Sequence, residues 1–231
     1  MEPLVELLSC PIRPLKTMIA LPFTTKSLPV VMALVERYSA TLKCLCFWNP
    51  DEAELPPARP VSTYPHLAFP DLRRIDFGYI SSPLLFQLVA RWTIPSLDTV
   101  EVREGSCVLP FLETHGGRVE QLGMDTERLD LGLTYDRVSA LCPNLKTLAV
   151  QILDAASNRD VPGRPLASVT TINVCRWPDK RVTGEQDSYL PRLVTKTNFP
   201  SLARVRYSTN HAGISKASVP LVFCAIFPDL T

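Results

Sequence analysis

The feature that most constrains this chain is a tetrapeptide that recurs along it. The tetrapeptide reads apolar residue, proline, small polar residue, leucine, and its copies are residues 69–72, 94–97, 142–145, 199–202 and 227–230. After the leucine of each complete copy, apolar residues recur at relative positions four and six, counting the leucine as position one. Such self-similarity is typical of chains that stack one small structural unit several times.

Seven segments fit positions one, four and six of this template. Their first residues are Leu42, Leu72, Leu97, Val119, Leu145, Val169 and Leu202. Neighbouring copies start 22 to 33 residues apart, in or near the roughly 20 to 29 residues of leucine-rich repeats. A weaker match lies at Leu15, Met18 and Ala20. A further copy that begins at Leu230 is cut off, which suggests a truncated C-terminus.

Each copy predicts a strand, and the segments between the copies predict helices. Positions four and six alternate as the inward residues of a short strand do. Apolar residues at helical spacing precede several strands, in residues 30–38, 84–92, 108–112 and 138–142 and more weakly in 189–194. The proline of the tetrapeptide disfavours helix in the residue before it, so the helix ends there. Gly116-Gly117 is expected to end another helix.

We therefore predict an α/β fold, an irregular leucine-rich-repeat solenoid with a parallel sheet on the concave side and helices on the convex side. Residues 1–28 form an N-terminal lead-in, and residues 29–231 form the solenoid. The asparagine that regular leucine-rich repeats carry after the strand is replaced by irregular residues such as Pro50 and Ile80, so reduced regularity is expected. The alternative is a non-repetitive α/β domain that matches a permissive template by chance.

Positions three, five and seven of each copy should face away from the core and line the concave surface. The candidate partner-binding residues at these positions are Trp48, Arg74, Asp76, Glu101, Arg103, Gln121, Asp125, Arg204 and Arg206. Tryptophan and arginine are enriched among the residues that dominate protein interfaces. The alternative is that each is an ordinary solvated residue of a sheet face.

Composition excludes several classes of partner. The 24 Lys and Arg residues against 23 Asp and Glu give a net charge of +1, which supplies no field that would attract nucleic acid or an anionic membrane. No apolar stretch is long enough for a membrane span. The seven cysteines are an odd number, and the N-terminus does not read as a signal peptide, so we expect free thiols in a cytoplasmic or nuclear compartment.

The sequence predicts no catalytic residue, cofactor or metal. His66, His115 and His211 stand in no spacing typical of a metal site or an activated nucleophile. Cys44 and Cys46 lack a second cysteine pair at zinc-finger distance, although two such thiols could form a redox-sensitive patch. No G-x-S-x-G elbow, P-loop or dinucleotide fingerprint is present.

The copies at residues 69–75, 94–97 and 142–148, together with residues 111–122, carry a family resemblance. They resemble the divergent repeats of F-box and leucine-rich-repeat-like proteins of basidiomycete (mushroom-forming) fungi, over residues 29–207. The resemblance implies that an F-box docks on the Skp adaptor of a cullin-based ubiquitin ligase while the repeats present a substrate. The F-box itself has no match before the first repeat, so this chain would be a fragment, a mis-predicted gene product, or a relative without that module.

We therefore expect a non-catalytic protein-binding scaffold, with substrate recognition in an F-box-type ubiquitin ligase as the role that the resemblance implies. Two alternatives from other classes stay open. One is a small α/β hydrolase-like enzyme whose nucleophile the motifs do not reveal. The other is an inert fragment with exposed apolar ends, which should aggregate when it is expressed alone.

Overall fold

The structure is a computed structural model. The described residues are 16–22, 27–48, 63–78, 80, 82–102, 107–125, 134–152, 162–176 and 194–209. The predicted helical stretch at residues 189–194 lies almost wholly outside them.

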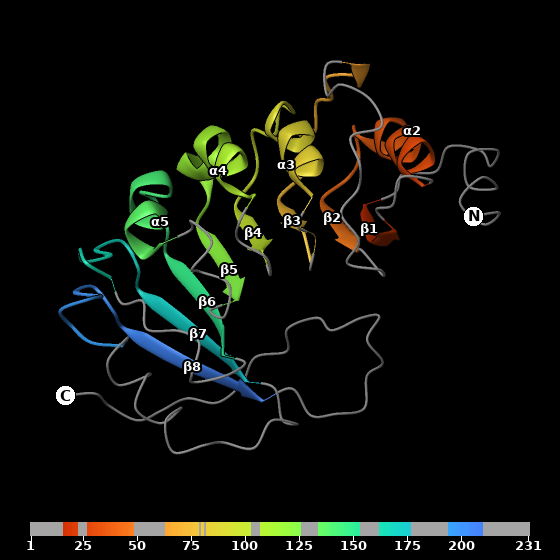
Figure 1. Ribbon diagram of the computed structural model, residues 1–231. Helices are drawn as coiled ribbons and strands as arrows, with labels where there is room; N and C mark the ends of the chain where they lie inside the picture. The colour runs from red at the N-terminus through yellow and green to blue at the C-terminus, as the bar shows by residue number, and fades with distance from the viewer. Residues whose placement is uncertain are drawn as a thin grey trace.

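Within the described residues, eight strands form one open sheet whose spatial order is the order of the strands in the sequence (Figure 1). The strands are β1 (Thr17–Pro22), β2 (Cys44–Trp48), β3 (Arg74–Asp76), β4 (Thr99–Val102), β5 (Gln121–Asp125), β6 (Thr147–Ile152), β7 (Thr171–Arg176) and β8 (Arg204–Thr209). Every neighbouring pair is parallel. The predicted α/β class with a parallel sheet is confirmed.

The described helices lie along the outer side of the curved sheet (Figure 1). They are α2 (Leu28–Tyr38), α3 (Pro83–Ala90), α4 (Leu109–His115), the 3-10 turn η2 (Gly116–Arg118) and α5 (Tyr135–Leu141). The helices α2, α3 and α4 carry a proline in the first turn, where a missing N–H costs nothing because the helix offers it no acceptor. Proline therefore starts helices in this chain, in addition to following them.

The strand register follows the repeat template without a shift from β2 to β8. The residues at position three stand opposite one another, and they are Cys44, Arg74, Thr99, Gln121, Thr147, Thr171 and Arg204. A one-residue slip would move every side chain of a strand to the other face. The predicted alignment of the seven copies is therefore confirmed at the level of the strands.

One backbone contact repeats at every junction between neighbouring copies. The carbonyl at position two of each copy accepts hydrogen bonds from the N–H groups at positions two and three of the next copy, at 2.7 to 3.1 Å. The accepting residues are Lys16, Lys43, Arg73, Asp98, Glu120, Lys146 and Thr170. This contact lies just ahead of each strand in the sequence, and it fixes the register of neighbouring copies where their strands begin.

The first strand departs from the template. Met18 pairs with Leu45 as predicted, but the register shifts afterwards, and Leu21 pairs with Phe47. The prediction that Ala20 takes position six of this weak copy is wrong by one residue, because an irregularity inserts an extra residue into β1.

In its four described copies the tetrapeptide forms the turn that leads into β3, β4, β6 and β8, and the copy at residues 227–230 lies outside the described residues. Its apolar residue and its leucine are buried, whereas the proline and the small polar residue between them are exposed in a turn. In two copies the leucine N–H donates to the carbonyl three residues earlier, at 3.1 Å from Leu145 to Cys142 and from Leu202 to Phe199. Proline suits the second place of such a turn because its ring fixes φ near the required value.

Copies without the proline use the same turn, which sequence reasoning missed. Val169 N donates to the Leu166 carbonyl at 3.2 Å, and Val119 N donates to the Gly116 carbonyl at 3.0 Å.

The small polar residue of the tetrapeptide makes a contact of its own in two copies. Ser96 Oγ donates to the Pro70 carbonyl at 2.6 Å, and Asn144 Nδ2 donates to the Gly117 carbonyl at 2.7 Å. The side chain of this residue thus hydrogen-bonds its own turn to the turn of the preceding copy.

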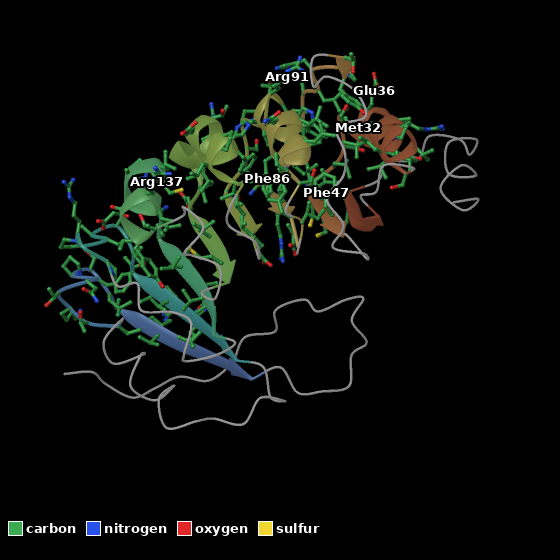
Figure 2. The ribbon with its side chains drawn as sticks, in the orientation of Figure 1. Met32, Glu36, Phe47, Phe86, Arg91 and Arg137 are labelled. Atoms are coloured by element: carbon green, nitrogen blue, oxygen red, sulfur yellow. The ribbon has the colours of Figure 1, made fainter. Side chains whose placement is uncertain are left out.

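The core lies between the sheet and the helices. Residues at positions one, four and six of the copies from Leu42 to Val174 are buried. Near its N-terminal half the core contains an aromatic group in which the ring centroid of Phe77 lies 4.6 Å from Phe86, 5.1 Å from Phe111 and 6.1 Å from Phe47. Phe47 and Phe86 lie in the layer between strands and helices, whereas Glu36, Arg91 and Arg137 lie on the outer side (Figure 2).

The last residue of α4, His115, is a buried histidine with a depressed pKa. Its ring is 2 % exposed, and Nε2 lies 3.3 Å from the Val89 carbonyl of α3. Burial lowers the pKa of His115 below its ordinary 6.5, because the low-dielectric interior disfavours the charged ring. The neutral ring packs against Phe111, with 4.9 Å between the ring centroids.

The buried histidine should make stability depend on pH below about 6.5. As pH falls through 6.5, the unfolded chain binds a proton at His115 while the folded chain does not, so the stability present above that pH is lost. We expect the free energy of unfolding to fall by up to about 1.4 kcal/mol per pH unit more in the wild type than in His115→Gln. Urea unfolding at pH values from 5 to 8 measures this, and equal slopes in the two chains would contradict it.

Candidate partner-binding face

The sheet face that turns away from the helices carries positions three and five of each copy. We call these residues of β2 to β8 the polar face. Position three is occupied by Cys44, Arg74, Thr99, Gln121, Thr147, Thr171 and Arg204, and position five by Cys46, Asp76, Glu101, Gly123, Ala149, Asn173 and Arg206. Because side chains alternate along a strand, burial of positions four and six under the helices requires this face to point away from them.

An ion pair crosses the polar face from β3 to β4. Arg74 Nη2 lies 2.6 Å from Glu101 Oε1, and the two side chains are 35 % and 12 % exposed. Arg74 stands opposite Thr99, and Glu101 stands two residues further along β4, so the pair is diagonal. Glu101 is thus buried among its neighbours, and Arg74 compensates its charge.

A glycine on the next strand makes room for Glu101. Gly123 stands opposite Glu101 in the register, and a Cβ at Gly123 would lie 3.1 Å from Glu101 Cγ. That distance is shorter than an ordinary contact between two carbon atoms. The Glu101 side chain therefore packs directly against the backbone of Gly123, where a Cβ would crowd it.

Asp76 has a local structural role in addition to its place on the polar face. Its Oδ1 accepts a hydrogen bond of 2.8 Å from Gly78 N. Gly78 has φ of +53°, a conformation that a residue without Cβ adopts without strain. The carboxylate therefore fixes the turn that ends β3.

The structure places the other predicted residues at separate points along the face. Gln121 on β5 and Arg204 on β8 are exposed, and Arg206 on β8 is half-buried. Trp48 and Asp125 end β2 and β5, but their side chains lie outside the described part, as does the whole of Arg103.

The predicted residues whose side chains the structure describes do not converge on one pocket. Adjacent strands lie about 4.8 Å apart, so β3 and β8, which are five strands apart, are separated by roughly 24 Å. Arg74, Asp76 and Glu101 form one group, and Arg204 and Arg206 form another. Such an arrangement fits contact with an extended macromolecular surface better than enclosure of a small molecule.

Asn173 is a buried polar residue that the prediction did not select. It is 6 % exposed, and its Oδ1 has no hydrogen-bond partner within the described residues. It stands between Ala149 and Arg206 in the register. Its place at position five of the template is the only signal in the sequence that could have pointed to it.

Two thiols stand beside the ion pair. Cys44 and Cys46 are half-buried on β2, and their Sγ atoms lie 3.7 Å apart. Cys44 stands opposite Arg74, and Cys46 stands opposite Asp76. The candidate binding residues did not include these thiols, although their spacing places both on one face of a strand.

A comparison of this chain with protein-family models, with curated proteins and with solved structures finds no match. In the described part of the chain no group of three or more His, Cys, Asp and Glu side chains is placed to hold a metal ion. No described helix has the length and apolar character that a membrane crossing requires.

Proposed function

We propose that this chain is an irregular leucine-rich-repeat solenoid that binds a protein partner on its concave, polar face and catalyses no reaction on that partner. The observation that carries the proposal is the register of β2 to β8, which continues without a shift and lines up fourteen residues of positions three and five as one surface. Stacked repeats characteristically use such extended concave surfaces to bind partners.

The chemistry of the polar face supports a protein partner over a nucleic acid. Between β2 and β8 the face carries Arg74, Arg204 and Arg206 with two carboxylates, threonines and small residues, so it has no single-sign stripe of charge. Phosphate backbones are recognised by clusters of basic side chains. Mixed charge that includes arginine, here on β3 and β8, is typical of contact with a folded protein surface.

The resemblance to fungal F-box proteins adds a specific partner class to this proposal. The Skp adaptor with its cullin is the first purified probe to be tested against the full chain. Capture of that adaptor by the full chain would support the role that the resemblance implies. If the adaptor and cullin do not bind the full chain, the link to the ubiquitin ligase is wrong. The proposal that remains is binding of an unrelated protein on the polar face.

Reversing charge on β8 should weaken partner binding, and reversing charge on the helical side should not. The test variant is Arg204→Glu with Arg206→Glu, and its matched control is Arg91→Glu with Arg137→Glu, which changes the same net charge on the outer side. We expect the first variant to lower the affinity for captured partners by at least about tenfold and the control by less than about twofold.

The measurement is a quantitative pulldown from fungal extract with immobilised full chain, read by mass spectrometry across a dilution series. Circular dichroism of both variants checks that each is folded. Equal or greater loss with the helical-side control would contradict binding through the polar face. If neither the wild type nor the helical-side control retains a specific partner, the inert-fragment alternative is favoured.

A further inference from the structure

The two thiols of β2 are placed for chemistry with each other. Their Sγ atoms lie 3.7 Å apart on the polar face, and both side chains are half-buried, so small molecules in solvent can reach them. We propose that Cys44 and Cys46 form a dithiol site that small-molecule disulfides of the glutathione class oxidise reversibly to an intrachain disulfide. Cys44 is the attacking thiol, and Cys46 is the resolving thiol.

The surroundings distinguish the two thiols. Cys44 faces Cys46 on its own strand, Arg74 and Asp76 on β3 and Glu101 on β4, and its registered neighbour on β1 is Thr17. The hydrogen bond from Cys46 is the largest effect and lowers the pKa of Cys44 from 9.0 to about 7; Arg74 lowers it too, while burial, Asp76 and Glu101 oppose. A large fraction of Cys44 is therefore thiolate near neutral pH, the form that attacks disulfides.

Cys46 has the opposite character. Its hydrogen bond to Cys44, burial and the charge of Asp76 all raise the pKa of Cys46 far above 9.0. It keeps its proton and donates it toward the Cys44 thiolate. When Cys44 is consumed in a mixed disulfide, that hydrogen bond is lost, and Cys46 becomes easier to deprotonate.

The reaction balances with one oxidised glutathione. The Cys44 thiolate attacks one sulfur of the glutathione disulfide, forms a mixed disulfide and releases one glutathione thiolate, which takes up a proton from water. Cys46 then loses its proton to water and attacks Cys44 Sγ, and the second glutathione leaves as a thiolate and is protonated. Counted from the dithiol, with the proton that Cys44 lost to water on ionisation included, the protein has lost two electrons and two protons, and the oxidised glutathione has gained them.

Strand geometry makes the resulting bond easy to reduce. Residues two apart on an extended strand have Cα atoms about 6.6 Å apart, near the upper end of the roughly 4.4 to 6.8 Å that disulfides span. Closing the bond therefore strains β2, and strained disulfides are the labile ones. Oxidation of this site would also alter the surroundings of Arg74, which stands opposite Cys44.

The test uses the full chain, fully reduced, with oxidised glutathione at pH 7, followed by alkylation and peptide mass spectrometry. In the wild type we expect loss of two hydrogens across Cys44 and Cys46. Cys46→Ser should accumulate glutathione on Cys44, and Cys44→Ser should accumulate it on Cys46 at least about tenfold more slowly. Cys142, which is 1 % exposed and whose pKa burial raises to about 12, is the internal unreactive control.

A second readout leaves both cysteines in place. The rate of iodoacetamide alkylation at Cys44 in the wild type, followed by peptide, should rise with pH around a midpoint near 7, and Arg74→Gln should move that midpoint upward. Two results would overturn the proposal. One is equal glutathionylation of Cys46 in Cys44→Ser and of Cys44 in Cys46→Ser, and the other is a stable mixed disulfide in the wild type without an intrachain bond.

Discussion

Phe77→Ala is expected to lower the free energy of unfolding by about 4 kcal/mol. The Phe77 side chain is 0 % exposed, and its ring contacts Phe86 of α3 and Phe111 of α4 at centroid distances of 4.6 and 5.1 Å. One ring thus joins the strand of one copy to the helices of the same copy and the next. Its removal leaves a cavity that rings held on two separate helices cannot both fill.

The measurement is urea unfolding followed by circular dichroism, with two companion variants. Phe77→Leu keeps much of the volume and should cost about 1 to 1.5 kcal/mol. Val205→Ala, which removes a half-buried side chain from β8, should cost under about 1 kcal/mol. If Phe77→Ala costs no more than Val205→Ala, the aromatic group does not hold neighbouring copies together.

Gly116→Ala is expected to destabilise the protein by about 3 kcal/mol, while Gly117→Ala should leave stability within about 0.5 kcal/mol. A Cβ at Gly116 would lie 2.5 Å from the Leu141 carbonyl oxygen and 3.1 Å from its carbon, whereas a Cβ at Gly117 would meet no atom within 4 Å. The obstacle is backbone at the end of α5, so one of the two adjoining copies would have to move.

The two glycines form a matched pair because they are neighbours in the same 3-10 turn and receive the same methyl group. Parallel urea denaturation of both variants compares them directly. The expected difference is about 3 kcal/mol in midpoint-derived stability. Similar stabilities of the two variants would show that η2 does not pack against the end of α5 as closely as the structure has it.

The strand register could be predicted from the sequence because positions one, four and six carry the core in every copy. A buried face imposes a strict spacing on each strand, and Leu45, Ile75 and Val100 therefore align as the template requires. The first strand could not be read in the same way. Several apolar residues in a row around Ala20 satisfy two registers equally, and only pairing with β2 selects the one with the irregularity.

The chemistry of the polar face was less predictable. The template places Glu101 on the face but does not reveal that it is 9 % exposed, since its burial depends on Arg74 one strand before and Gly123 one strand after.

The end of α4 at His115 was predicted. The reason is different from the expected one, since Gly116 has an ordinary helical φ of −57° and is needed for the close approach of Leu141.

Photocrosslinking tests the central claim, partner binding through the polar face, most directly. A photoreactive benzophenone amino acid replaces Gln121, exposed on β5, or Glu113, exposed on α4 of the outer side. After irradiation in the extract used for the pulldown, covalent adducts are identified by mass spectrometry. We predict defined adducts from the Gln121 position and background labelling from the Glu113 position. Defined adducts from the Glu113 position alone would contradict the claim and place the partner on the helices.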